Sequence, residues 1–202
     1  MLAAAVTGTV LQLGLVAALC AAAWLAFARR RTGFRLWLGL HKAPIGSIAL
    51  GLAVGASAAA ILMSVPFIRE TAGGPGSVPR SALADGNVAS AYAALAILAL
   101  FKTALAEELL FRGLIGKRLI ARLGFGIGNA CQAALFGAVH LLVALSPLAT
   151  AGLVAALVAF TAATGFINGW LNEKRGGGSI LPGWAAHASA NLIAYAAVAT
   201  SL

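Results

Sequence analysis

The composition and charge of the chain indicate whether it folds in water or in a membrane. It has 202 residues, of which 61% are hydrophobic and only 9% are charged, whereas a soluble domain carries roughly a quarter charged residues. A water-soluble globular protein is therefore excluded. The net charge of +9 does not indicate nucleic acid as a partner, because the basic residues lie in short clusters between long apolar runs and not along a polar face.

Two long uncharged runs come first in the chain. Residues 1–28 contain no charged side chain and are long enough to cross a bilayer, which takes about 20 apolar residues. We predict a retained membrane helix and not a cleaved signal peptide, because the three arginines at 29–31 follow this run and do not precede it. A second uncharged run covers 44–68. The Gly- and Pro-rich stretch at 73–79 is typical of a turn and not of a helix.

The third run places two ionisable residues at the same depth. It predicts a helix from about Asn87 to Arg122, followed by a turn at Gly124. Glu107 lies 17 residues before that glycine, and His140 lies 16 residues after it. In an antiparallel hairpin with a rise of about 1.5 Å per residue, both would lie about 24–26 Å from the turn. The spacing therefore predicts that Glu107 and His140 come level inside the protein.

The rest of the chain completes a helical membrane bundle. Residues 124–172 contain no Lys, Arg, Asp or Glu. This run is too long for one membrane helix, and we predict a break at Ser146–Pro147. A final apolar run covers 180–202. We predict an all-α polytopic bundle of about six transmembrane helices, in one integral membrane domain over residues 1–202.

The basic residues predict the orientation of this bundle. Five Lys or Arg lie in 29–43, four in 112–124 and two in 172–182, against only Arg69 and Arg80 on the other side. Basic loops stay in the cytoplasm, so both termini would lie on the outer side. The Ala- and Gly-rich composition hints at a bacterial source. We therefore predict a multi-pass protein of the bacterial inner (cytoplasmic) membrane.

Ionisable side chains inside predicted spans are the features that need an explanation. A carboxylate in the bilayer costs at least about 2.5–3.5 kcal/mol on insertion scales, so such residues indicate function. Glu108 and Arg112 are four residues apart and can form an ion pair on one helical face, which leaves Glu107 available. In the alternative interpretation, both acids pair with Arg112 and Lys102, and the histidines are hydrogen-bonded core residues.

These side chains form a set that could hydrolyse an amide. Glu107 could take a proton from a water molecule that His140 orients, while His187 and Asn191, one turn apart, could donate hydrogen bonds to the developing oxyanion. No GxSxG nucleophile motif is present. We predict no cofactor, although His140, His187 and Glu107 could alternatively hold zinc. The HExxH motif of zinc proteases is absent.

Three short motifs carry a resemblance to a known family. They are EExxxR, written EELLFR at 107–112, FxxxH, written FGAVH at 136–140, and HxxxN, written HASAN at 187–191. Their type and order resemble the CPBP family (CAAX protease and bacteriocin-processing) of intramembrane proteases, which includes the Rce1-like CAAX prenyl endopeptidases. The resemblance covers about residues 95–200. It implies an Rce1-like catalytic core there, preceded by N-terminal helices over 1–94.

The resemblance also implies roles for the motif residues. Water would be activated by Glu107 and His140, and the oxyanion would be stabilised by His187 and Asn191. The supporting residues would be Glu108, Arg112 and Phe136. The implied partners are a membrane-associated protein or peptide substrate and the lipid bilayer. Two other interpretations stay open: a membrane transporter or proton-relay protein, and a non-catalytic immunity or scaffold member of the same family.

Overall fold

The chain is helical throughout. The computed structural model describes residues 1–84, 86–144 and 150–201, with side chains at all of these except 142–144. Every regular element in these ranges is a helix, and η marks π-helical stretches. In chain order they are α1 (Leu2–Phe27), α2 (Phe34–Leu38), α3 (Ile45–Met63), α4 (Pro66–Gly73), α5 (Val78–Leu83), α6 (Val88–Ile97), η1 (Leu98–Leu105), η2 (Glu108–Gly116), α7 (Lys117–Ala144), α8 (Ala151–Trp170), η3 (Leu171–Arg175) and α9 (Leu181–Ala199). The predicted all-α fold class is confirmed.

Four helical stretches of the described residues are long and apolar enough to cross a membrane. They are Leu2–Phe27, Ile45–Met63, Val88–Leu141 and Ala151–Arg175. The third has 54 residues and contains a reversal of the chain, and α9 is not among the four. The count of six spans therefore stays a prediction. The predicted break at Ser146–Pro147 lies outside the described residues.

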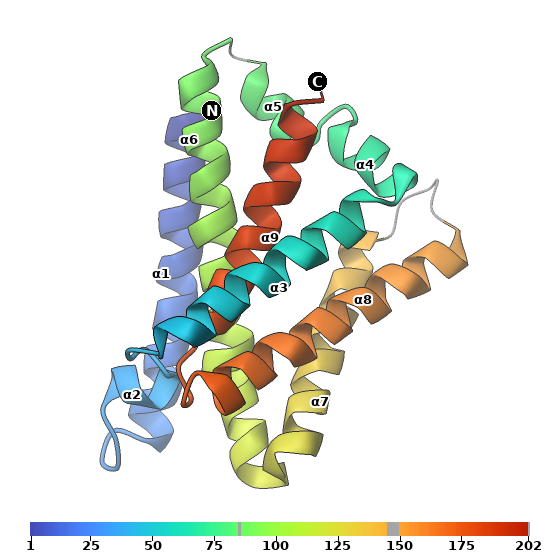
Figure 1. Ribbon diagram of the computed structural model, residues 1–202. Helices are drawn as coiled ribbons and strands as arrows, with labels where there is room; N and C mark the ends of the chain where they lie inside the picture. Colours follow the sequence, from blue (N-terminus) through green and yellow to red (C-terminus); the bar gives the residue numbers. More distant parts are fainter. Residues whose placement is uncertain (85, 145–149, 202) are drawn as a thin grey trace.

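One long helical rod and its return limb form the frame of the molecule. The rod begins where the side chain of Asn87 accepts a hydrogen bond from the backbone N–H of Ser90 at 2.9 Å, a helix N-cap. It runs through α6, η1 and η2 to Gly124, whose φ of 75° reverses the chain, so that the rest of α7 returns beside it (Figure 1). The predicted turn is confirmed. The rod is not the regular α-helix that we expected, because two π-helical stretches flank Glu107.

Helix α3 packs directly on the backbone of α9. Four small residues spaced four apart form its buried stripe: Ser47, Gly51, Gly55 and Ala59. A Cβ atom on Gly51 would collide with the carbonyl oxygen of Pro182, and one on Gly55 with that of Ala186. Small residues at such spacing let two membrane helices approach closely. The first half of α9, which carries His187, is therefore held against α3 by backbone contact.

Replacing Gly55 by alanine is expected to push α3 away from α9. The added methyl group has no space, because the neighbouring atoms are the backbone of Ala186 and the hydroxyl of Ser189. Overpacking of this kind costs about 1–3 kcal/mol, which a thermal unfolding assay in detergent would show as a lower Tm. The matched control is Gly46→Ala on the same helix, where no atom lies within 4 Å of the new methyl group. An equal Tm for the two variants would contradict this packing.

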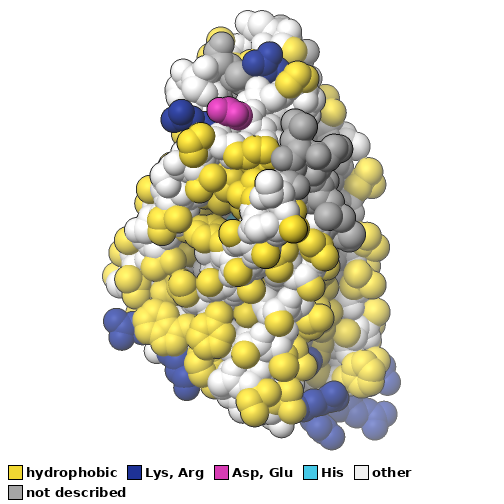
Figure 2. Space-filling model, turned by 90° about the vertical axis from the view of Figure 1, so that its right-hand side faces the viewer, with side chains coloured by type: hydrophobic (Ala, Val, Ile, Leu, Met, Phe, Trp, Pro, Cys, Tyr) yellow, Lys and Arg dark blue, Asp and Glu magenta, His cyan; other side chains and the backbone are white. Residues whose placement is uncertain are grey.

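The basic segments of the chain meet at one end of the bundle. The N–H of Ile180 donates to the carbonyl of Gly39 at 3.0 Å, Arg118 donates to the carbonyl of Trp37 at 2.8 Å, and Lys117 pairs with Glu173 at 2.8 Å. In Figure 2, Lys and Arg side chains gather at this lower end below a broad hydrophobic surface. Both termini lie at the opposite end, near α4 and α5 (Figure 1).

The Gly- and Pro-rich stretch at 73–79 is helical only at its two ends. Residues 74–77 are non-helical, as predicted, whereas Gly73 ends α4. Pro79 lies in the first turn of α5, where a missing N–H needs no partner. Glu70 lies in α4 and Glu173 in η3.

Candidate active site

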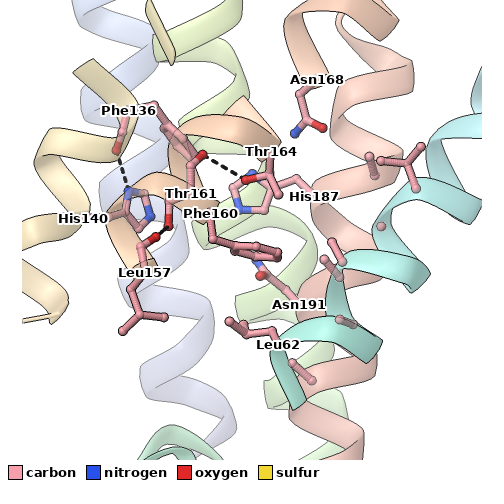
Figure 3. A pocket seen from close by; sticks show the side chains of 17 residues that line it. Leu62, Phe136, His140, Leu157, Phe160, Thr161, Thr164, Asn168, His187 and Asn191 are labelled. Carbon is pink, nitrogen blue, oxygen red and sulfur yellow. Dashed lines mark hydrogen bonds between the residues drawn. The ribbon is translucent and has the colours of Figure 1, made fainter. Parts of the chain in front are cut away.

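A cavity of about 320 Å³ opens between α3, α7, α8 and α9. Most of its wall is apolar and comes from small residues of α3 and α9 and larger ones of α8, such as Leu157 and Phe160. Its polar groups include His140, His187 and Asn191 (Figure 3). Three of the four residues with a predicted catalytic role therefore line one apolar cavity within the helical bundle.

The carboxylate of Glu107 faces both of these histidines. Its Oε2 lies 3.9 Å from Nε2 of His140 and 3.8 Å from Nε2 of His187. The same oxygen is buried and has no hydrogen-bond partner among the residues that the structure describes. Both distances are too long for a direct hydrogen bond, but each fits a pair of polar atoms bridged by one water molecule. Glu107 and His140 therefore come level, as predicted by counting residues from Gly124.

Each histidine is held through its Nδ1 atom. Nδ1 of His140 lies 2.7 Å from the carbonyl oxygen of Phe136, and Nδ1 of His187 lies 3.4 Å from Oε1 of Glu108. A carbonyl oxygen can only accept a hydrogen bond, and the same is true of an ionised carboxylate. Nδ1 therefore carries the hydrogen in both rings. The two Nε2 atoms are thereby left to face Glu107, and either can accept a proton.

The second carboxylate, Glu108, is fully buried, and three side chains contact its Oε1 atom. Its Oε1 lies 3.1 Å from Nη1 of Arg112 and 3.2 Å from Nδ2 of Asn168, in addition to its contact with His187. The predicted pairing of Glu108 with Arg112 is confirmed. Lys102, which the alternative interpretation pairs with an acid, makes no ion pair with Glu107 or Glu108 in the described part of the chain.

Phe136 connects the ion pair to the histidines. Its ring is buried and lies 4.5 Å from the ring of His140 and 6.0 Å from that of His187, centroid to centroid. The guanidinium of Arg112 lies 4.0 Å above the centre of the same ring, a cation–π contact. Phe136 thus packs against both imidazoles while its carbonyl orients one of them.

Asn191 lies one turn after His187 on α9. Its Nδ2 donates a hydrogen bond to Oγ1 of Thr103 at 2.8 Å, so the carboxamide is held from the rod that carries Glu107. Thr103 and Asn168 contact the site residues but were not predicted from the sequence, because neither is ionisable or belongs to one of the three motifs. The available signal was a hydroxyl and a carboxamide inside predicted spans, where an unpaired polar group is costly.

The alternative zinc interpretation involves His140, His187 and Glu107. Among the residues that the structure describes, no group of three or more His, Cys, Asp or Glu side chains is arranged to hold a metal ion. The absence of a cofactor and the zinc alternative both stay predictions.

Comparison with known proteins identifies the family. The model of the type II CAAX prenyl endopeptidase Rce1-like family matches residues 89–193, just over half of the chain. The chain belongs to the Rce1-like family. Searches of curated proteins and of solved structures found no match. The Rce1-like segment contains both glutamates, both histidines and Asn191, and its family consists of CAAX-type intramembrane proteases. The chain is thus an integral membrane protein of a peptidase family.

Proposed function

We propose that the protein is an intramembrane endopeptidase that hydrolyses a peptide bond of a membrane-associated protein or peptide. One observation carries this proposal: Oε2 of Glu107 and the Nε2 atoms of His140 and His187 converge beside an apolar cavity. A water molecule within hydrogen-bond distance of these atoms would face the carboxylate of Glu107, which can take its proton. Such a water is activated as a nucleophile.

The role proposed for His187 requires a hydrogen on its Nε2. Its Nδ1 lies 3.4 Å from Oε1 of Glu108, and a carboxylate at that position stabilises the positive charge of a ring that carries hydrogens on both nitrogens. His187 then acts as a donor, whereas Glu107 and His140 act as acceptors.

The reaction follows from these protonation states. Glu107, assisted by His140, takes a proton from the water as its oxygen forms a bond to the substrate carbonyl carbon. His187 and Asn191 donate hydrogen bonds to the resulting oxyanion, which is the largest single contribution in many acyl-transfer enzymes. The carbonyl then re-forms and the C–N bond breaks. The leaving amine receives the proton held by Glu107, and the products are a carboxylic acid and an amine.

The cavity indicates the kind of group that lies beside the cleaved bond. Its wall on α3 consists of Val54, Gly55, Ala58, Ala59 and Leu62. Of the described residues that line it, only His140 and His187 have ionisable side chains. A charged substrate side chain would be desolvated there without a partner. We propose that the substrate places an uncharged, apolar group in this cavity.

The orientation in the membrane follows from the basic end of the bundle. We infer that the end formed by α2, the Gly124 turn and η3 faces the cytoplasm of a bacterial cell, since basic loops stay on that side. Ten of the fourteen Lys and Arg residues lie in the segments at this end, within 29–42, 117–122 and 174–175, whereas Arg112 is buried in the candidate active site.

Cleavage in proteoliposomes tests the proposed function. The purified protein would be reconstituted with a library of membrane-anchored peptides, and products would be identified by mass spectrometry with and without a zinc chelator. We expect cleavage at one peptide bond, with addition of one water, at a rate that the chelator does not change. Loss of activity with the chelator and its recovery with added zinc would instead support the metal mechanism.

A further inference from the structure

Thr103 is a polar residue in the apolar part of the rod that no motif of the chain includes. It lies on η1, four residues before Glu107. Its Oγ1 is 2.8 Å from Nδ2 of Asn191, 3.0 Å from the carbonyl oxygen of Leu98 and 3.2 Å from that of Ala99. These two carbonyls precede Thr103 by five and four residues, and the π-helical winding of η1 brings both within reach of one hydroxyl.

The chemistry of the hydroxyl sets the direction of each of these hydrogen bonds. A threonine hydroxyl has one hydrogen, and a backbone carbonyl can only accept. The hydrogen of Thr103 is therefore donated to Leu98 or Ala99, and its oxygen can only accept from Asn191. The carboxamide of Asn191 must consequently turn its nitrogen, and not its oxygen, toward Thr103.

We propose that Thr103 is a positioning residue that fixes the carboxamide of Asn191 as a hydrogen-bond donor to the oxyanion. This inference rests on the proposed function. The amide nitrogen has two hydrogens; Thr103 accepts one, and the other is free to meet a substrate carbonyl in the cavity that Asn191 lines. Thr103 and Glu107 lie on the same rod. The hydrogen bond from Asn191 to Thr103 therefore also fixes the distance between the proton acceptor, Glu107, and the oxyanion donor, Asn191.

Thr103→Val tests the proposal, since it keeps the shape of the side chain and removes the acceptor. We expect kcat to fall about 10- to 100-fold, somewhat less than the loss of an oxyanion donor itself, with KM changed less than about twofold, as for an interaction made in the transition state. Thr103→Ser keeps the hydroxyl and should retain most of the activity. Thr9→Val is the matched control, because the buried hydroxyl of Thr9 donates to the carbonyl of Ala5 in its own helix and not to a site residue within the described part of the chain.

A double-mutant cycle separates positioning from general support of the fold. Once Asn191 is replaced by alanine, Thr103→Val should lower kcat no further, because the two residues act through one hydrogen bond. Unchanged kcat in Thr103→Val, or equal losses in the presence and absence of the Asn191 carboxamide, would overturn the proposal. A raised KM with unchanged kcat would also overturn it.

A second measurement does not depend on catalysis. The Tm shifts caused by Thr103→Val and Asn191→Ala should be non-additive if the hydrogen bond joins the two residues. Additive shifts would overturn the proposal even if the protein cleaves peptides. Absence of cleavage by the unsubstituted protein would reject the proposed function and, with it, the assignment of Asn191 to an oxyanion. The two failures are therefore distinguishable.

Discussion

Replacing Glu107 by glutamine is expected to abolish peptide cleavage while the protein still folds and inserts into membranes. Glutamine has the size of glutamate but cannot take a proton from water, so the acceptor that faces both histidines is lost. General-base catalysis contributes about 10²- to 10⁴-fold, and we expect kcat to fall within or beyond that range. The measurement is the initial rate of cleavage in proteoliposomes, with the inserted fraction determined on the same sample.

Glu70→Gln is the matched control for this variant. It makes the same chemical change on α4, where Glu70 is exposed, at the end of the bundle opposite the basic segments. Its turnover should equal that of the unsubstituted protein. Full turnover by Glu107→Gln would reject the assigned role of Glu107 and favour a non-catalytic member of the family.

Replacing Arg112 by methionine is expected to cause the largest loss of stability. The side chain of Glu108 is 0% exposed and that of Arg112 only 2%, so the variant leaves a carboxylate buried without its cation. Breaking a buried ion pair on one side costs about 3–5 kcal/mol. Thermal or chemical unfolding in detergent would measure this loss as a lower Tm or transition midpoint.

A double variant and a control complete the test of the buried pair. Glu108→Gln combined with Arg112→Met removes both charges and should recover much of the stability. It should not recover activity, because His187 loses its carboxylate partner. Lys117→Met breaks the ion pair with Glu173 at the partly exposed basic end, where we expect a loss of at most about 1 kcal/mol. Equal losses for Arg112→Met and Lys117→Met would show that the Glu108 pair is solvated.

The alignment of the candidate carboxylate Glu107 with His140 could be predicted because helical geometry converts residue number into distance from a turn. A turn at Gly124 and an approximate helical rise were enough to bring the two residues level, although the π-helical η2 lies between Glu107 and that turn. The pairing of Glu108 with Arg112 was predictable for the same reason, since residues four apart share a helical face. These predictions depend on one helix or one hairpin and require no knowledge of distant contacts.

The contacts of neutral polar residues could not be predicted in this way. Thr103 and Asn168 find their partners on other helices, and those partners depend on how the whole bundle packs. The π-helical stretches beside Glu107 were also missed, because apolar periodicity over a few turns is similar for both helix types. The short helices α4 and α5 were missed because proline, usually a sign of a turn, also starts helices.

The contribution of α3 has a consequence for how such a protein could change its selectivity. The groups assigned to the reaction come from the rod, α7 and α9, whereas the residues that α3 places in the cavity are all apolar. Of these, Val54, Ala58 and Leu62 lie outside the stripe that packs on α9. Substitutions at these three positions would reshape the space beside the cleaved bond and leave every proton-transferring group in place. New substrates could therefore be acquired by altering one helix face, without rebuilding the catalytic apparatus.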